Sequence, residues 1–220
     1  MTLISASLLS CRDNLKEITK DFNNLDIDYI HLDIMDGKFV PYNSFTDDEI
    51  KIISDNTNKP FDVHLMVNDP LKYISKYANL NTSYITIHYE AITDLKIFDV
   101  IKSYGIKVGI SIKPNTEVDE IFDLLPLVDL VLVMSVEPGR GGQEFIKSTL
   151  DKINKLSKKI KSLNLDVLIS VDGGINNNNS NECKINGVKM LVIGSALANS
   201  NDKNLFISQC KNNINTMNIN

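Results

Sequence analysis

The stretch Leu130-Val-Leu-Val-Met-Ser-Val136 is an almost continuous apolar run, which predicts a buried β-strand. Residues 147–163 follow it, and their apolar side chains recur at helical spacing: Ile153, Leu156, Ile160 and Leu163. A second apolar run then covers residues 166–172. A buried strand, an amphipathic helix and another buried strand predict a parallel βαβ unit.

The same alternation extends over the whole chain, with helix-like segments such as 46–54 and 95–104 between short apolar runs. The predicted strands are 3–9, 28–34, 61–67, 83–89, 107–113, 130–136, 166–172 and 190–196. Eight strands, each followed by a helix without any linker, predict an α/β fold, a closed (β/α)₈ barrel forming a single domain over residues 1–220. A doubly wound open sheet is the alternative, but residues 3–12 lack the glycines that such sheets often carry after the first strand.

Composition excludes several classes of function. The chain has 220 residues, of which 43% are hydrophobic and 23% charged, as in an ordinary globular protein. Its net charge of −5 argues against a nucleic-acid partner, and no apolar run is long enough for a membrane span. Three scattered cysteines (Cys11, Cys183 and Cys210) are too few for a disulfide framework, so we expect a reduced, cytoplasmic location.

All three histidines lie near the C-terminal ends of predicted strands. His31 and Asp33 are two residues apart on one strand, so their side chains point to the same face. His64, His88 and Asp172 lie near the ends of other strands, and such ends gather at one mouth of a barrel. Two nitrogens and two oxygens, from His31, Asp33, His64 and Asp172, suit a divalent transition metal ion (zinc, iron(II), manganese or cobalt) better than calcium.

Asp33 and Asp172 are also candidates for acid–base catalysis. They come from different sides of the predicted barrel, so one could remove a proton from one face of a carbon and the other return a proton to the opposite face. A metal between them would lower their pKa values and stabilise an adjacent oxyanion. This pattern indicates epimerisation through an enediolate. Asp172 equally fits a structural role as a loop cap before Gly173 and Gly174.

Glycine-rich segments follow the last three predicted strands, at 136–143, 173–174 and 194–195. Glycine allows backbone N–H groups to approach an anion, and loops after the last two strands of such barrels commonly bind phosphate. The three segments together predict a phosphate site, although each alone also suits a tight turn. Four further residues near the same mouth are expected to line the pocket: Met35, Met66, His88 and Met134.

Four segments closely resemble the motifs of the ribulose-phosphate 3-epimerase family, in that family's order: His31–Pro41, Asp62–Val67, Val131–Gln143 and Val171–Gly174. The resemblance runs essentially from end to end. It implies a TIM barrel of the ribulose-phosphate binding type that interconverts D-ribulose 5-phosphate and D-xylulose 5-phosphate in the pentose phosphate pathway. It also implies metal ligation by His31, Asp33, His64 and Asp172, with Asp33 and Asp172 as the acid/base pair.

The resemblance further implies which residues touch the substrate. The expected contacts are Ser7, His64, Gly139, Gly141, Gly142, Gly173, Gly174, Gly194 and Ser195. Arg140, in the same loop as Gly139, is a further candidate that the resemblance itself does not supply. The expected partners are a small ketose phosphate and further copies of the chain, as a dimer or a hexamer.

Several positions depart from the family pattern. The family usually has proline where Ala6 stands, histidine at Lys38, asparagine at Tyr42 and phenylalanine at Arg140. The stretch after Ser7 also looks one residue short. These departures concern the loop over the pocket rather than the reaction. Arg140 either reaches the substrate phosphate when the loop closes or is a solvated loop tip.

Three alternatives compete with this interpretation. An epimerase for a six-carbon substrate such as allulose 6-phosphate would use the same residues, so the motifs do not separate the two. A related decarboxylase or lyase would carry Asp-x-Lys-x-x-Asp on the third strand, where this chain has Asp62, His64 and Val67 and lacks the lysine. A non-catalytic sugar-phosphate-binding barrel would be indicated by loss of Asp33 or Asp172, and both are present.

Overall fold

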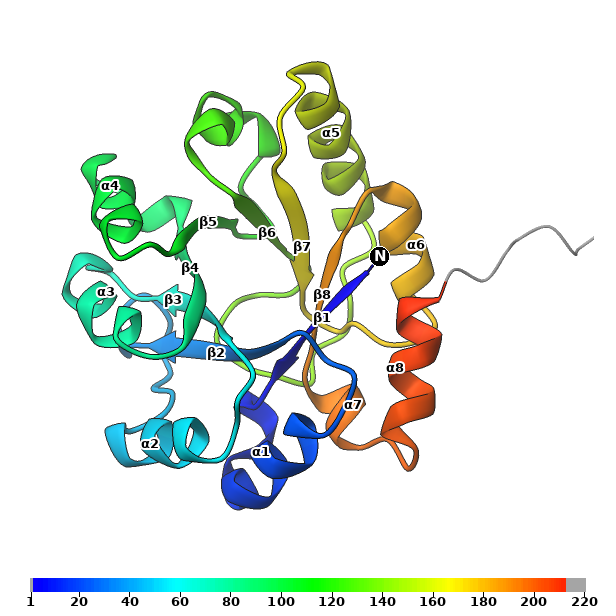
Figure 1. Cartoon of the computed structure of the whole chain (residues 1–220). Coiled ribbons are helices and arrows are strands. Elements are labelled where there is room, and N and C mark those ends of the chain that lie inside the picture. The colour runs from blue at the N-terminus through cyan, green and yellow to red at the C-terminus, as the bar shows by residue number, and fades with distance from the viewer. Residues whose placement is uncertain (1, 213–220) are drawn as a thin grey trace, which may run out of the picture.

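Residues 2–212 are described by the computed structural model, and within them eight parallel strands close into a barrel in sequence order (Figure 1). The strands are β1 (Leu3–Ser7), β2 (Tyr29–Met35), β3 (Phe61–Met66), β4 (Thr82–His88), β5 (Lys107–Ile112), β6 (Leu130–Met134), β7 (Leu168–Asp172) and β8 (Met190–Ile193). Each strand pairs with the next along the chain, and β8 pairs with β1 to complete the ring. The predicted barrel is confirmed, and every predicted strand overlaps an observed one.

Helical segments connect the strands and surround the barrel (Figure 1). The α-helices are α1 (Leu15–Asn23), α2 (Asp47–Asp55), α3 (Leu71–Ala78), α4 (Lys96–Ser103), α5 (Thr149–Ser162), α6 (Ser180–Asn186), α7 (Ser195–Ala198) and α8 (Lys203–Lys211). The 3₁₀ segments are η1 (Leu9–Asn14), η2 (Tyr89–Ala91) and η3 (Val118–Leu127). The helices predicted over 46–54, 95–104 and 147–163 match α2, α4 and α5. Within residues 2–212, no helix has both the length and the apolar character needed to cross a bilayer.

The connection between β5 and β6 differs from the others, because η3 is a 3₁₀ segment rather than an α-helix. Its buried residues Val118 and Ile121 are three positions apart, a spacing that places both on the same face of a 3₁₀ turn. Pro126, inside the segment, lacks the N–H group that an α-helix would require there. The segment still covers the barrel with its apolar face.

Arg12, one of the two arginines, has a structural role. Its guanidinium group lies 2.8 Å from a Glu49 carboxylate oxygen and sits over the ring of Phe45. Glu49 also completes a capping box with Thr46 at the start of α2, in which each residue's side chain accepts from the other's backbone N–H. Arg12 therefore ties η1 to α2.

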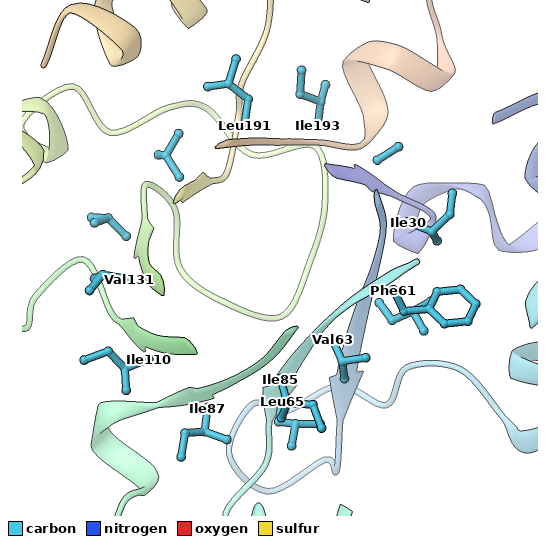
Figure 2. Close-up of a cluster of buried hydrophobic side chains, with 14 of the residues drawn as sticks. Ile30, Phe61, Val63, Leu65, Ile85, Ile87, Ile110, Val131, Leu191 and Ile193 are labelled. Carbon is cyan, nitrogen blue, oxygen red and sulfur yellow. The ribbon is translucent and has the colours of Figure 1, made fainter. Parts of the chain in front are cut away.

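The main hydrophobic core lies between the barrel and the surrounding helices. Alternate residues of the strands, among them Ile30, Val63 and Ile110, are fully buried and point outward toward the helices (Figure 2). The helices contribute buried residues such as Phe22 on α1 and Leu156 on α5. This layer contains most of the buried apolar side chains and holds the strand ends in place.

The barrel interior is divided into a polar and an apolar part. On β6 and β8, the inward residues form a small apolar cluster that includes Leu130, Leu132, Met134, Met190 and Val192. On β1 to β5, buried polar side chains predominate: Ser5, Ser7, His31, Asp33, Asp62, His64, Thr86, His88 and Ser111. Gly109 on β5 makes room for one of them, because a Cβ atom there would lie 2.2 Å from the Thr86 hydroxyl oxygen. Buried polar groups at this density indicate a functional site rather than a packed core.

Candidate active site

A cavity of about 250 Å³ opens at the C-terminal ends of the strands, where barrels of this fold carry their chemistry. Among its lining residues are many that the sequence singled out: Ser7, Asp33, Met66, Met134, Gly139, Arg140, Gly141, Gly142, Asp172, Gly173, Gly174, Gly194 and Ser195. Ser10, Asn176 and Asn199 also line it, and the sequence motifs did not point to them. The dimensions suit a small metabolite.

Four side chains meet at the floor of this cavity. His31, Asp33, His64 and Asp172 each offer one donor atom, and these atoms all lie within 4.8 Å of one another. The Oδ1 atom of Asp33 is 3.4 Å from Nε2 of His31 and 3.5 Å from Nδ1 of His64. The strands explain this geometry, since His31 and Asp33 share one face of β2 and Asp33 is the register partner of His64 on β3.

The donor set fits a divalent transition metal. Nε2 of His31 and Nδ1 of His64 are buried and have no hydrogen-bond partner among the described residues. A buried polar atom without a partner is costly, so such atoms call for an explanation. Here both unpartnered nitrogens face the same carboxylate oxygen, with a second carboxylate beside it. Two imidazole nitrogens and two carboxylates are the ligands that zinc and its neighbours prefer.

His31 is oriented so that its Nε2 atom can bind a metal. Its Nδ1 atom is 2.8 Å from Oδ2 of Asp62, which also accepts a 2.8 Å hydrogen bond from the hydroxyl of Ser5. An ionised carboxylate only accepts hydrogen bonds, so Nδ1 carries a proton and Nε2 is the nitrogen that faces the cluster. Burial lowers the pKa of His31, but Asp33 and Asp62 outweigh it and hold that pKa well above its usual value in the metal-free protein, so a metal at Nε2 would displace a proton. A carboxylate behind a ligating histidine is the usual arrangement in metal sites.

Asp33 is oriented by Ser7, whose hydroxyl donates a 2.9 Å hydrogen bond to Oδ2 of Asp33. The other carboxylate oxygen of Asp33 faces the two histidines. The sequence placed Ser7 in contact with substrate, and the structure places it both at the cavity wall and on this carboxylate.

The two aspartates differ in their affinity for protons. Burial, together with the nearby charge of Asp33, raises the pKa of Asp172 to about 7. Burial also opposes ionisation of Asp33, but the interactions with His31 and His64 outweigh it and hold the pKa of Asp33 well below its usual range. The neighbouring environments therefore push the two pKa values apart, as expected when one group acts as acid and the other as base.

In the metal-free protein, Asp172→Asn is expected to remove part of the pH dependence of folding stability. The pKa of Asp172 rises from a usual 3.8 to about 7, so over this window the folded protein keeps a proton that the unfolded chain has lost. The contribution of Asp172 to stability is therefore full below the lower value and is lost as the pH rises to the upper one. Urea unfolding in EDTA across this window should give a free energy of unfolding that falls less with pH in the variant. Equal pH slopes in the two proteins would contradict this.

Two residues expected in the pocket lining are not among the residues that line the cavity. Met35 is buried in a small cluster with Val40 and Met66. His88 is fully buried behind His64, with 3.0 Å between their Nε2 atoms. His64 and His31 also lie beneath the cavity surface, so Asp33 and Asp172 are the members of the cluster that line it.

Close backbone contacts fix the glycine-rich loops at the rim. Gly174 has φ +64°, and a Cβ atom there would lie 2.5 Å from the backbone nitrogen of Phe145. At Gly141, a Cβ atom would lie 2.3 Å from the hydroxyl of Ser10. The loop after β6 is thus packed directly against the loop after β7, and the backbone contact at Gly174 leaves no room for a Cβ there.

Two carboxylates behind the cluster were not predicted as site residues, although the sequence carries a signal for both. Asp62 precedes His64 by two residues on β3, and Glu90 follows His88 by two at the start of η2. The same spacing joins His31 to Asp33, where it was used to infer a shared face. The spacing of His88 and Glu90 indicates the contact between them, whereas Asp62 shares a face with His64 but binds His31 on the neighbouring strand.

Comparison with known proteins shows the family of the chain. The model of the ribulose-phosphate 3 epimerase family matches residues 3–198. The ribulose-phosphate 3-epimerase of Bacillus subtilis is 34% identical, with 96% of each chain covered. That of Helicobacter pylori is 36% identical over 95% of this chain and 96% of its own.

Solved structures with low sequence identity show the same fold. KGPDC from Streptococcus mutans aligns with a TM-score of 0.68 at 12% identity, over 96% of both chains. The 3-hexulose-6-phosphate synthase of Salmonella typhimurium aligns with a TM-score of 0.65 at 17% identity, again over 96% of both. These likenesses concern the barrel alone, whereas the family match and the closer relatives extend over nearly the whole sequence. The chain therefore belongs to the ribulose-phosphate 3-epimerase family of enzymes.

Proposed function

We propose that this enzyme interconverts D-ribulose 5-phosphate and D-xylulose 5-phosphate by inverting the configuration at C3. The observation that carries the proposal is the pair Asp33 and Asp172, which both line the cavity and whose pKa values are displaced in opposite directions. Two carboxyl groups in one small cavity, one of which holds its proton more tightly than the other, form the acid–base pair that such an inversion needs.

The proton transfers follow from this pair. The ionised carboxylate removes the proton from C3, and the electron pair of the broken C–H bond forms the double bond of an enediolate. The carboxylic acid on the other side of the cavity then gives its proton to the opposite face of C3. In the reverse direction the two aspartates exchange roles, so each serves as acid and as base over a full cycle.

The neighbouring residues support these transfers. Ser7 holds Asp33 through its 2.9 Å hydrogen bond, which keeps the carboxylate turned toward the cluster. Met66 and Met134 line the cavity and present thioether side chains that exclude water from the reacting carbon. His31, Asp33, His64 and Asp172 would hold a divalent zinc, iron(II), manganese or cobalt ion, which when bound would supply positive charge that stabilises the enediolate oxyanion.

The substrate phosphate is proposed to lie at the rim, against the glycine-rich loops after β6, β7 and β8. Gly141, Gly174 and Gly194 line the cavity there, together with Ser195 at the start of α7. Backbone N–H groups in such loops bind phosphate oxygens without requiring a basic protein overall. This arrangement leaves the sugar carbons facing the aspartates.

Arg140→Phe is expected to raise KM about tenfold with little change in kcat, because a guanidinium group on the phosphate would contribute binding in the ground state and transition state alike. Arg140 is exposed and lines the cavity, within a loop held by a 2.9 Å hydrogen bond from the Gln143 side chain to the Arg140 carbonyl oxygen. Steady-state kinetics on ribulose 5-phosphate would measure the change. Arg140→Lys, which keeps the charge, should show a smaller increase. An unchanged KM in Arg140→Phe would make Arg140 a solvated loop tip.

The experiment that tests the proposed function follows the hydrogen at C3 by NMR in D₂O. Purified protein, ribulose 5-phosphate and added zinc, iron(II) or manganese should yield xylulose 5-phosphate that carries deuterium at C3. Binding of the sugar phosphate without exchange would contradict the proposal and indicate a non-catalytic barrel. Much faster exchange on allulose 6-phosphate would keep the proton transfers and replace the five-carbon substrate by a six-carbon one.

We further propose that the enzyme acts in the cytoplasm, within the pentose phosphate pathway and as a homo-oligomer. All three cysteines are free thiols, and Cys183 and Cys210 are buried, which suits a reducing compartment. Light scattering on the purified protein would give the oligomeric state.

A further inference from the structure

We propose that Glu90 and His88 form a positioning relay that sets which ring nitrogen of His64 carries a proton, and so makes His64 able to bind a metal. The inference deepens the proposed function, since it rests on the proposed metal site. Glu90 and His88 are outside that site: neither belongs to the four-residue cluster nor lines the cavity. They act through His64.

The relay is a chain of two hydrogen bonds that begins at a half-buried carboxylate. Oε2 of Glu90 is 3.0 Å from Nδ1 of His88. Nε2 of His88 is in turn 3.0 Å from Nε2 of His64. Both histidine side chains are fully buried, so each ring nitrogen needs a partner of the right kind within the protein.

The direction of these hydrogen bonds follows from the carboxylate. An ionised carboxylate accepts but cannot donate, so Nδ1 of His88 must carry the proton. A neutral His88 then has a lone pair on Nε2 and accepts from Nε2–H of His64. His64 is left with its lone pair on Nδ1. This is the nitrogen that faces Asp33 Oδ1 in the cluster and has no other partner among the described residues.

Without the relay, the opposite arrangement would compete. Asp33 Oδ1 lies 3.5 Å from Nδ1 of His64 and would attract a proton there. A proton on Nδ1 blocks that atom as a metal ligand. The hydroxyl of Ser111, 3.3 Å from Nε2 of His64, can either donate or accept and therefore imposes no direction. The Glu90 carboxylate, which can only accept, therefore sets the direction of the hydrogen bonds in the relay.

Glu90 is itself fixed by donors on its other oxygen. Its Oε1 atom accepts a 2.9 Å hydrogen bond from the backbone N–H of Lys113 and another from the hydroxyl of Thr116. The backbone N–H of Lys113 can only donate. A side chain of the same shape at position 90 is therefore expected to place an acceptor at the Oε1 position.

This constraint makes Glu90→Gln a sharp test. The glutamine carbonyl oxygen must take the Oε1 position to accept from Lys113, which turns the NH₂ group toward His88. An amide donor facing Nδ1 of His88 forces its proton to Nε2, which then donates to Nε2 of His64. The proton of His64 moves to Nδ1. The isosteric substitution thus reverses every hydrogen bond in the relay while preserving its shape.

The first measurement is NMR of metal-free, ¹⁵N-histidine-labelled full-length protein, in which the three histidines can be assigned individually. The ¹⁵N shifts of a neutral ring distinguish Nε2–H from Nδ1–H. We expect His64 to be Nε2–H in the wild type and Nδ1–H in Glu90→Gln. An unchanged His64 form in the variant overturns the relay.

The second measurement is the affinity for Zn²⁺ alone, by competition with a chromogenic chelator. Loss of a partner behind a metal ligand typically weakens metal binding about 10–100-fold, which is the loss expected for Glu90→Gln. Glu90→Ala, which leaves His88 free to place its proton on either nitrogen, should lose less. Glu17→Gln, at an exposed position on α1, is the matched control and should bind as the wild type does.

The order of the two Glu90 variants in Zn²⁺ affinity distinguishes the relay from simpler roles of Glu90. A purely structural role predicts that alanine is worse than glutamine, and a purely electrostatic role predicts that both lose equally. Either of these orders overturns the proposal, as does wild-type affinity in Glu90→Gln. If the wild type binds no Zn²⁺, the metal in the proposed function is wrong, while the NMR comparison still decides the relay.

Discussion

Asp172→Asn is expected to lower kcat by about 10²–10⁴-fold, the usual contribution of a positioned acid or base, and Asp33→Asn should lower it comparably. In the proposed mechanism each aspartate handles the proton on one face of C3, so losing either one interrupts both directions of the reaction. An asparagine side chain keeps the size of the aspartate but cannot take up a proton. Both residues line the cavity, which places them within reach of substrate.

The size of this loss would be measured by steady-state kinetics, and its cause by isotope exchange at C3. A variant that keeps one carboxylate can still remove the proton from one face, so exchange into one of the two sugars should survive better than net interconversion. Asp99→Asn, at an exposed position on α4, provides a matched control that should leave turnover unchanged. Near-normal kcat in Asp172→Asn would rule out the two-aspartate scheme.

Removal of metal by chelation is expected to lower turnover by roughly a hundredfold or more, because a metal ion commonly contributes several kcal/mol to stabilising an oxyanion. The structure supports this expectation through the unpartnered nitrogens of His31 and His64. In the metal-free protein, moreover, burial and the charge of Asp33 raise the pKa of Asp172 to about 7. Without a metal ion, the negative charge of Asp33 therefore disfavours the ionised form of Asp172.

Dialysis against EDTA followed by an activity assay, with each metal then added back, would measure the effect. Zinc, iron(II), manganese or cobalt should restore turnover, whereas calcium should not, since imidazole nitrogens are poor ligands for calcium. Full activity after verified removal of metal would leave the four-residue cluster without a metal role. His31→Ala should lower turnover as chelation does, and added metal should not restore it.

The barrel and much of the cluster could be predicted from the sequence because both depend on strand periodicity. Apolar runs such as residues 130–136 specify strands, and the two-residue spacing of His31 and Asp33 specifies a shared face. The meeting of His31 and Asp33 with Asp172 follows from the fold, since a closed barrel brings the ends of distant strands to one mouth. The conformation of η3 could not be predicted in the same way, because its apolar spacing fits an α-helix nearly as well.

The height of a residue along the barrel axis was harder to predict from the sequence than the face of the strand on which its side chain lies. Met35 and His88 were expected in the pocket because they lie at strand ends, but one packs under the loop after β2 and the other lies behind His64. Strand tilt in a barrel shifts each residue up or down relative to its neighbours, which the sequence does not reveal. The orientation of Glu90 depends on donors from another strand end, Lys113 and Thr116, and local sequence carries no trace of such a contact.

On β2 and β3, outward apolar residues alternate with inward polar residues, so the two sets can change independently during evolution. Changes at inward positions can alter which bond is made or broken, while outward positions such as Ile30 and Val63 go on holding the strands to the helices. The chemistry of such a barrel can thus change while the protein remains folded. The same kind of barrel can therefore carry different active sites.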